Sequence, residues 1–158
     1  RIPAVVVDHK LYSNQEDYET EVIRQLKDHG VELVCLAGYM KIVSLRIINE
    51  FKGKMMNIHP ALLPSFPGLQ VQKKALDYGA KVSGCTVHFV DEGTDTGPII
   101  MQSVVPIIED DTVESLSARI IKEEHKIYPK AIDLFAKGRL VIDGRRVKVL
   151  GIKKSNNL

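Results

Sequence analysis

Apolar and polar positions along the chain follow two periods, one typical of buried strands and the other of amphipathic helices. Strands are predicted where short runs are continuously apolar and rich in β-branched residues. Helices are predicted where apolar residues recur every three to four positions and a stop signal follows. The predicted strands span residues 4–8, 31–38, 54–59, 81–90 and 98–107. The predicted helices span residues 13–30, 44–51 and 69–79, a long one opens at Asp111, and a hairpin over 139–150 follows it.

The order of these segments predicts an α/β protein. Ser13 with Glu16, and Asp111 with Glu114, have the spacing of capping boxes at helix starts. A strand, a helix and a strand over residues 4–38 form a βαβ unit, whose crossover helix makes the two strands parallel. We therefore predict a single domain over residues 1–158 with three layers and a mainly parallel sheet. Ligands of such sheets bind at the carboxyl ends of the strands.

Composition excludes several function classes. The 158 residues are 44% hydrophobic and 27% charged, which is typical of a globular domain. A net charge of +2 gives no electrostatic footprint for nucleic acid, and no apolar run approaches the ~20 residues of a membrane span. Cys35 and Cys85 lack metal-ligand or disulfide spacing, so we interpret them as buried free thiols in a reducing cytoplasm.

The stretch "NIHPALLPSFPG" ends a predicted strand with polar groups and then with prolines. Asn57 and His59 lie two residues apart, so their side chains project from the same face of the strand. An amide and an imidazole at that position can stabilise a negatively charged oxygen and move a proton. A hydrogen-bonded core histidine would give the same pattern, and spacing alone leaves both readings open.

A second candidate lies in the loop "DEGTDTGP". Asp95 has glycines on both sides, and it is either a functional carboxylate or a turn residue that bonds its own backbone. Asp91 and Glu92 compete with it for the functional role. The sequence contains no nucleophile elbow, phosphate-binding P-loop or zinc-binding motif. An asparagine, a histidine and an aspartate without these motifs favour acyl transfer between two bound substrates through a tetrahedral intermediate.

"NIHPALLPSFPG" and "GCTVHFVDEGTDTGPIIMQ" resemble the folate-dependent formyltransferase family, whose fold is Rossmann-like. The resemblance runs from "VVVD" to about Gly138 and is strongest with the branch that acts in the third step of purine synthesis. It implies that the formyl group of 10-formyltetrahydrofolate is transferred to the amine of glycinamide ribonucleotide, without a metal. It further implies that Asn57, His59 and Asp95 are catalytic. In this scheme Asn57 and a protonated His59 stabilise the oxyanion, and Asp95 keeps His59 charged.

The resemblance also implies binding residues. The segment that would read the folate ring comprises Met40, Lys41, Ile42 and Val43, with Asn57 beside it. The loop that would close over the pteridine comprises Asp91, Glu92, Gly93, Thr94 and Asp95. Glu124 matches the acid that binds the ribose hydroxyls, and His88 is interpreted as a core or supporting residue.

Family members begin with a strand and a Gly-Ser-Asn-type loop that binds the nucleotide phosphate, and no such segment precedes Arg1. From the ~30-residue size of a βαβ unit and its flanks, we expect that about fifty residues, including the first βαβ portion, are missing. This predicts weak nucleotide binding by the 158-residue chain. The resemblance implies a monomer or homodimer in the cytoplasm, with small-molecule substrates and no nucleic-acid or membrane partner.

Other activities remain open at this stage. Formyltetrahydrofolate hydrolase shares the same catalytic residue types and uses water as the acceptor. Formyltransferases that act on transfer RNA or on sugar nucleotides are further alternatives. A folate-binding protein without catalysis is the alternative from a different class.

Overall fold

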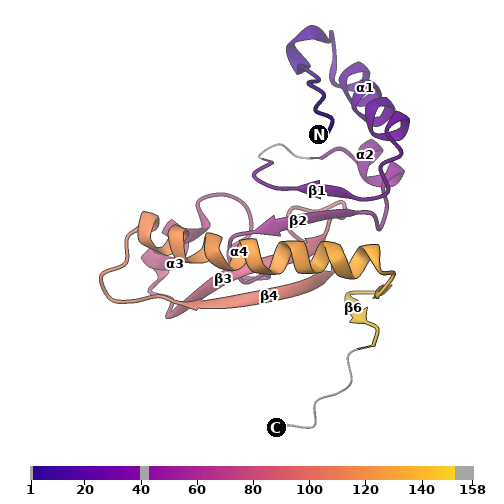
Figure 1. Cartoon of the computed structure of the whole chain (residues 1–158). Coiled ribbons are helices and arrows are strands. Elements are labelled where there is room, and N and C mark those ends of the chain that lie inside the picture. The colour runs from indigo at the N-terminus through magenta and orange to yellow at the C-terminus, as the bar shows by residue number, and fades with distance from the viewer. Residues whose placement is uncertain (1, 40–42, 152–158) are drawn as a thin grey trace.

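A six-stranded mixed sheet organises the protein, whose structure is a computed structural model that describes residues 2–39 and 43–151 (Figure 1). The strands are β1 (Val34–Leu36), β2 (Met55–His59), β3 (Val82–Phe89), β4 (Ile99–Pro106), β5 (Leu140–Asp143) and β6 (Arg146–Val149). Their order across the sheet is β1-β2-β3-β4-β6-β5. The pairings place β1, β2, β4 and β6 in one direction and β3 and β5 in the other.

Helices cover both faces of this sheet. They are η1 (His9–Leu11), α1 (Gln15–Asp28), α2 (Leu45–Glu50), α3 (Val71–Tyr78) and α4 (Val113–Ala136). Side chains alternate along a strand, so successive residues of β2 point to opposite faces of the sheet. Met55 packs with Ile23 of α1 and Ile47 of α2, whereas Met56 belongs to the larger core under α4. The α/β class and the three layers predicted from the sequence are therefore confirmed.

Helix α4 covers the centre of the sheet and forms the main core. Figure 1 shows it lying across β2, β3 and β4. Leu116 and Ile120 of α4 are buried with Val87 and Phe89 of β3. None of the helices formed by residues 2–39 and 43–151 has the length and apolar character needed to cross a membrane.

Both predicted helix N-caps are displaced by one residue, and only α4 forms a capping box. Asn14, and not Ser13, caps α1, accepting a hydrogen bond from the backbone N–H of Asp17 at 2.8 Å. Thr112 caps α4 and forms a reciprocal capping box with Ser115. The carboxylate of Asp111, the predicted cap, instead pairs with the guanidinium of Arg119 at 2.8 Å. Competing residues of the same capping type at adjacent positions explain both displacements.

The predicted strand over residues 4–8 is wrong. Residues 2–8 form neither helix nor strand, and the side chains of Val5 and Val6 are 52% and 90% exposed. A β-branched run forms a strand only where a neighbouring strand supplies hydrogen bonds, and no described strand pairs with this one. The βαβ unit predicted at the start of the chain is therefore not formed by the described residues.

Candidate active site

Strand β2 places two of the predicted catalytic residues on one face of the sheet. Asn57 is half-buried and His59 is 4% exposed, and Pro60 follows directly where the strand ends. Because they are two residues apart, both project on the face opposite Met56 and helix α4. The prediction that the Asn57 amide and the His59 imidazole project from the same face of the strand is confirmed.

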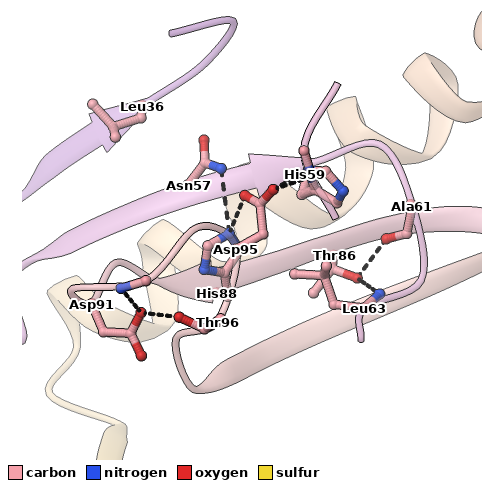
Figure 2. A network of polar contacts seen from close by, with 12 residues as sticks. Leu36, Asn57, His59, Ala61, Leu63, Thr86, His88, Asp91, Asp95 and Thr96 are labelled. Carbon is pink, nitrogen blue, oxygen red and sulfur yellow. Dashed lines mark hydrogen bonds and ion pairs between the residues drawn. The ribbon is translucent and has the colours of Figure 1, made fainter. Parts of the chain in front are cut away.

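The antiparallel register of β2 and β3 adds two further polar side chains to the same face. His88 lies directly opposite Asn57, and Thr86 lies directly opposite His59. The amide Nδ2 of Asn57 lies 3.3 Å from Nε2 of His88. Figure 2 shows the three side chains Asn57, His59 and His88 gathered around Asp95.

The hydrogen bonds of His88 define its proton arrangement. Its Nδ1 lies 2.8 Å from the carbonyl oxygen of Phe89, so Nδ1 donates. Its Nε2 is then free to accept from the amide of Asn57 in the neutral ring. Burial lowers the pKa of His88, against the opposing influence of the Phe89 carbonyl and Asp95. The neutral ring therefore orients the Asn57 amide as a donor, and the second N–H of that amide has no partner among the described residues.

Asp95 joins the two histidines. Its Oδ2 lies 3.3 Å from Nδ1 of His59, and its Oδ1 lies 3.7 Å from Nε2 of His88. The other ring nitrogen of His59, Nε2, lies 2.9 Å from the carbonyl oxygen of Phe66. Both nitrogens of His59 thus lie near oxygen acceptors: Nε2 is within hydrogen-bond distance of the Phe66 carbonyl, and Nδ1 is within ion-pair distance of Asp95. The backbone N–H of Gly68 also donates to Asp95 Oδ2 at 2.8 Å.

The proline-containing loop after β2 is held against the sheet by buried polar contacts. The hydroxyl of Thr86 donates to the carbonyl of Ala61 at 2.7 Å and accepts from the N–H of Leu63 at 3.1 Å. The amide of Gln102 donates to the same hydroxyl at 3.0 Å and to the carbonyl of Leu63 at 2.9 Å. This clamp, drawn in part in Figure 2, fixes the loop that supplies the Phe66 carbonyl to His59.

The loop that carries Asp95 does not reach the site in the way the sequence suggests. Strand β3 is antiparallel to β2, so its carboxyl end at Phe89 lies beside Met56, away from His59. The loop instead folds back over the sheet face, with Asp95 in the left-handed region at φ 55°. Gly97 lies so close to the Phe89 carbonyl that an added Cβ would be 1.7 Å from its oxygen. This backbone fold, and not a shared strand edge, delivers the carboxylate.

The remaining folate-loop candidates differ in their surroundings. Met40, Lys41 and Ile42 lie outside the described residues, and Val43 is half-buried against the α1–α2 core. Oδ1 of Asp91 accepts hydrogen bonds from the backbone N–H of Gly93 at 3.1 Å and from the hydroxyl of Thr96 at 2.6 Å. The loop residues Glu92, Gly93 and Thr94 are exposed. Asp91 thus supports the loop internally, while Asp95 is the loop carboxylate that contacts His59.

Glu124 stands apart from the other candidates. It lies half-buried on α4, on the opposite face of the sheet from the histidines. Burial raises its pKa, and the nearby charges of His125 and His59 oppose that rise. Glu124 is therefore within electrostatic reach of His59 without belonging to the cluster around Asp95.

The site also depends on residues that the sequence did not single out. Two backbone groups contact the catalytic candidates directly: the Phe66 carbonyl bonds His59, and the Gly68 N–H bonds Asp95. The side chains of Thr86 and Gln102 hold the loop that carries these backbone groups. The one available signal was "TVH", in which Thr86 and His88 share a strand face. That Thr86 and His88 lie opposite His59 and Asn57 depends on the antiparallel register of β2 and β3, which the local sequence pattern does not encode.

The assembled groups suit acyl transfer. An amide N–H, an imidazole and a carboxylate converge where a carbonyl oxygen could accept hydrogen bonds and a proton could move. Within residues 2–39 and 43–151, no group of three or more His, Cys, Asp or Glu side chains could hold a metal ion. Burial raises the pKa of the Cys85 thiol to about 12, so this thiol is protonated and unsuited to nucleophilic attack.

Comparison with known proteins identifies relatives over most of the chain. The family model described as formyl transferase matches residues 1–132. Glycinamide ribonucleotide transformylase 1 from Symbiobacterium toebii has a solved structure with a TM-score of 0.88 and 54% identity; the match covers 90% of this chain and 68% of that one.

Curated relatives include both short and long proteins. Phosphoribosylglycinamide formyltransferase of Bacillus subtilis (strain 168) is 48% identical over 83% of this chain and 67% of its own length. The trifunctional purine biosynthetic protein adenosine-3 of Drosophila melanogaster is 50% identical over 89% of this chain. The chain spans only 10% of that larger protein.

Proposed function

The chain belongs to the formyl transferase family, and we propose that it transfers the formyl group of 10-formyltetrahydrofolate to the amine of glycinamide ribonucleotide. Relatives that are 48% and 54% identical carry the names of enzymes of this activity. The main support for this proposal is the position of the Asp95 carboxylate, whose oxygens lie 3.3 Å from Nδ1 of His59 and 3.7 Å from Nε2 of His88. The amide of Asn57 is hydrogen-bonded to His88 in the same cluster. The reaction places this protein at the third step of purine synthesis.

Direct attack of the amine on the formyl carbon fits the site. The nucleotide amine forms a new C–N bond, and the formyl oxygen of the tetrahedral intermediate becomes negatively charged. The second N–H of Asn57 stabilises this oxygen, together with the Nε2–H of a protonated His59 once that N–H turns from the Phe66 carbonyl to the substrate. His59 then supplies the proton that the departing folate nitrogen needs as its C–N bond breaks. Asp95 accepts the proton lost by the amine, through water, and keeps His59 charged.

The folate is proposed to lie along the segment Met40, Lys41, Ile42 and Val43 and under the loop from Asp91 to Asp95. The loop is suited to cover the folate because its conformation is fixed by internal contacts. Asp91 accepts hydrogen bonds from Gly93 and Thr96, and Gly97 packs against the Phe89 carbonyl. Exposed loop residues over a rigid sheet are common at binding sites. In this arrangement Asp95 contributes to both folate binding and catalysis.

Glu124 is proposed to bind the ribose hydroxyls of the nucleotide. Its pKa is raised by burial, so hydrogen bonds donated by two hydroxyls would compensate for lost solvation of the carboxylate. We place the protein in the cytoplasm as a monomer or homodimer, with small molecules as its substrates.

A spectroscopic assay tests the proposed reaction. The absorbance of released folate is followed with and without glycinamide ribonucleotide, using the full gene product. Release should require the nucleotide and fall at least about a hundredfold in His59→Ala and Asp95→Ala, in line with the usual contribution of a proton-transfer group. Asp77→Ala, which removes an exposed carboxylate paired with Lys73 on α3, is the control and should keep wild-type activity.

The same assay separates the competing activities. Release that is indifferent to the nucleotide would identify a hydrolase and contradict the role of Glu124. Folate binding without any release would identify a non-catalytic binding protein.

A further inference from the structure

The C-terminal hairpin touches the loop that carries Asp95. Arg145 lies at its tip, between β5 and β6, next to Gly144 at φ 57°. Its Nη1 donates to the carbonyl oxygen of Thr96, the residue directly after Asp95. The same nitrogen lies 3.9 Å from Oδ2 of Asp91. A single guanidinium therefore contacts the loop on both sides of Asp95.

Asp91 transmits this contact through the loop. While Oδ2 faces Arg145, its Oδ1 accepts from Gly93 N–H and from the Thr96 hydroxyl, as Figure 2 shows for the Thr96 contact. Arg145, Asp91 and Thr96 form a closed set of polar contacts around the segment that holds Asp95. Displacing Arg145 would remove a polar contact from both Asp91 and Thr96.

The hairpin has its own anchorage, so it can act as a fixed reference for the loop. Leu140 of β5 and Val147 of β6 pack against the main core. Strand β6 pairs with the start of β4, where Arg146 lies opposite Ile99. The hairpin lies beyond residues 1–132 that the family model matches. Arg145 thus brings a part of the chain outside that match into contact with the catalytic loop.

We propose that Arg145 is a positioning residue for Asp95: it fixes the loop over residues 91–97 and thereby keeps the Asp95 carboxylate between His59 and the Gly68 N–H. The inference rests on the proposed formyl transfer for its kinetic consequence. The side chain of Arg145 is 72% exposed, so solvent screens its charge. We therefore expect a loss of only about three- to fivefold in kcat/KM for Arg145→Ala, the range typical of exposed charged contacts.

Two measurements test the role. Hydrogen exchange of the backbone amides over residues 91–97 should be faster in Arg145→Ala than in the wild-type protein. Lys148→Ala is the matched control: it removes one positive charge from the same hairpin, where Lys148 pairs with Asp143 at 2.5 Å. This control should leave both loop exchange and kcat/KM unchanged. Arg145→Lys, which keeps the charge but loses the planar fork, should be intermediate.

A double substitution tests whether Arg145 acts through Asp95. In an Asp95→Asn background, Arg145→Ala should cause no additional loss of kcat/KM, because the group it positions no longer carries its charge. Independent losses, or loop exchange equal to that of Lys148→Ala, would overturn the proposal. Absence of nucleotide-dependent release by the wild-type protein would contradict the proposed function instead, and the exchange comparison would still decide whether Arg145 holds the loop.

Discussion

Asp95 combines an unusual backbone conformation with a central position among the catalytic candidates. Its φ of 55° lies in the left-handed region, which aspartate and asparagine tolerate better than most residues. Its carboxylate also accepts from Gly68 and faces His59. The residue type is therefore constrained by both the backbone and the chemistry, and a substitution can separate the two.

Asp95→Asn is predicted to remove the chemistry and keep the fold. The amide oxygen can still accept from Gly68, and asparagine suits the left-handed backbone. The lost charge leaves His59 without an anionic partner, so kcat should fall about 10²- to 10⁴-fold, as for loss of an acid–base group. Steady-state kinetics and chemical denaturation measure the two effects. A loss of activity accompanied by an equal loss in Asp91→Asn would show that loop structure, and not the Asp95 charge, is responsible.

Among the secondary-structure elements, β3 supports the site through its polar face, which holds the proline-containing loop. Thr86 is fully buried, and its hydroxyl serves Ala61, Leu63 and Gln102 together. Thr86→Val keeps the shape and leaves the buried Ala61 carbonyl and Leu63 N–H without this partner. We predict that the free energy of unfolding falls by about 2 kcal/mol, the cost of unsatisfied buried polar groups. Displacement of the loop should also lower kcat/KM by about tenfold or more.

Thr20→Val provides the control for this prediction. Thr20 lies on the exposed side of α1, where its hydroxyl donates to the Glu16 carbonyl at 2.7 Å. The same chemical change there should alter stability by less than about 0.5 kcal/mol, as is usual for surface positions. Denaturation curves of the two variants compare them directly, and equal losses would contradict the clamp.

The sequence predicted those elements whose signals are local. The apolar run that ends at His59 predicted β2, and the spacing of Asn57 and His59 predicted their common face. Helices α2 and α3 and the terminal hairpin also lie where the periodicity placed them. In each case the local spacing of apolar residues predicted the element, and for β2 the alternation of side chains also predicted the shared face.

Long-range pairing could not be predicted in the same way. Residues 4–8 have strand composition but no described partner strand, and the direction of β3 follows from its pairing with β2. The approach of Asp95 to His59 depends on a loop that reverses over the sheet, and the contact of Arg145 with Thr96 joins residues 49 positions apart. Such contacts depend on tertiary packing, for which local pattern carries no direct signal.

On the scale of the whole molecule, the main apolar core lies on one face of the sheet, and the polar site lies on the other face together with the smaller apolar cluster under α1 and α2. Helix α4 packs its apolar side chains on one face, and the histidines and Asp95 lie on the other. The polar face nevertheless buries His88, whose side chain is only 2% exposed. Burial of a titratable ring ties this face to the global stability of the fold.

This burial predicts an acid-sensitive stability. The pKa of His88 is lowered in the folded state from its ordinary value of 6.5, so the unfolded chain takes up a proton first as the pH falls below 6.5. Stability from the neutral ring is therefore present above pH 6.5 and is lost as the pH falls toward the folded-state pKa. The slope from this one residue cannot exceed about 1.4 kcal/mol per pH unit, the value for one proton.

The comparison of wild type with His88→Gln isolates this contribution. Urea denaturation from about pH 7.5 to about pH 5.5 should show a smaller acid loss in the variant, because glutamine does not titrate. Glu124, whose raised pKa contributes with the opposite sign, is present in both proteins and cancels in the difference. His29→Gln, at an exposed position, should not reduce the acid loss. An equal acid loss in wild type and His88→Gln would mean that folding does not lower the pKa of His88, which would contradict its assignment as a neutral acceptor for Asn57.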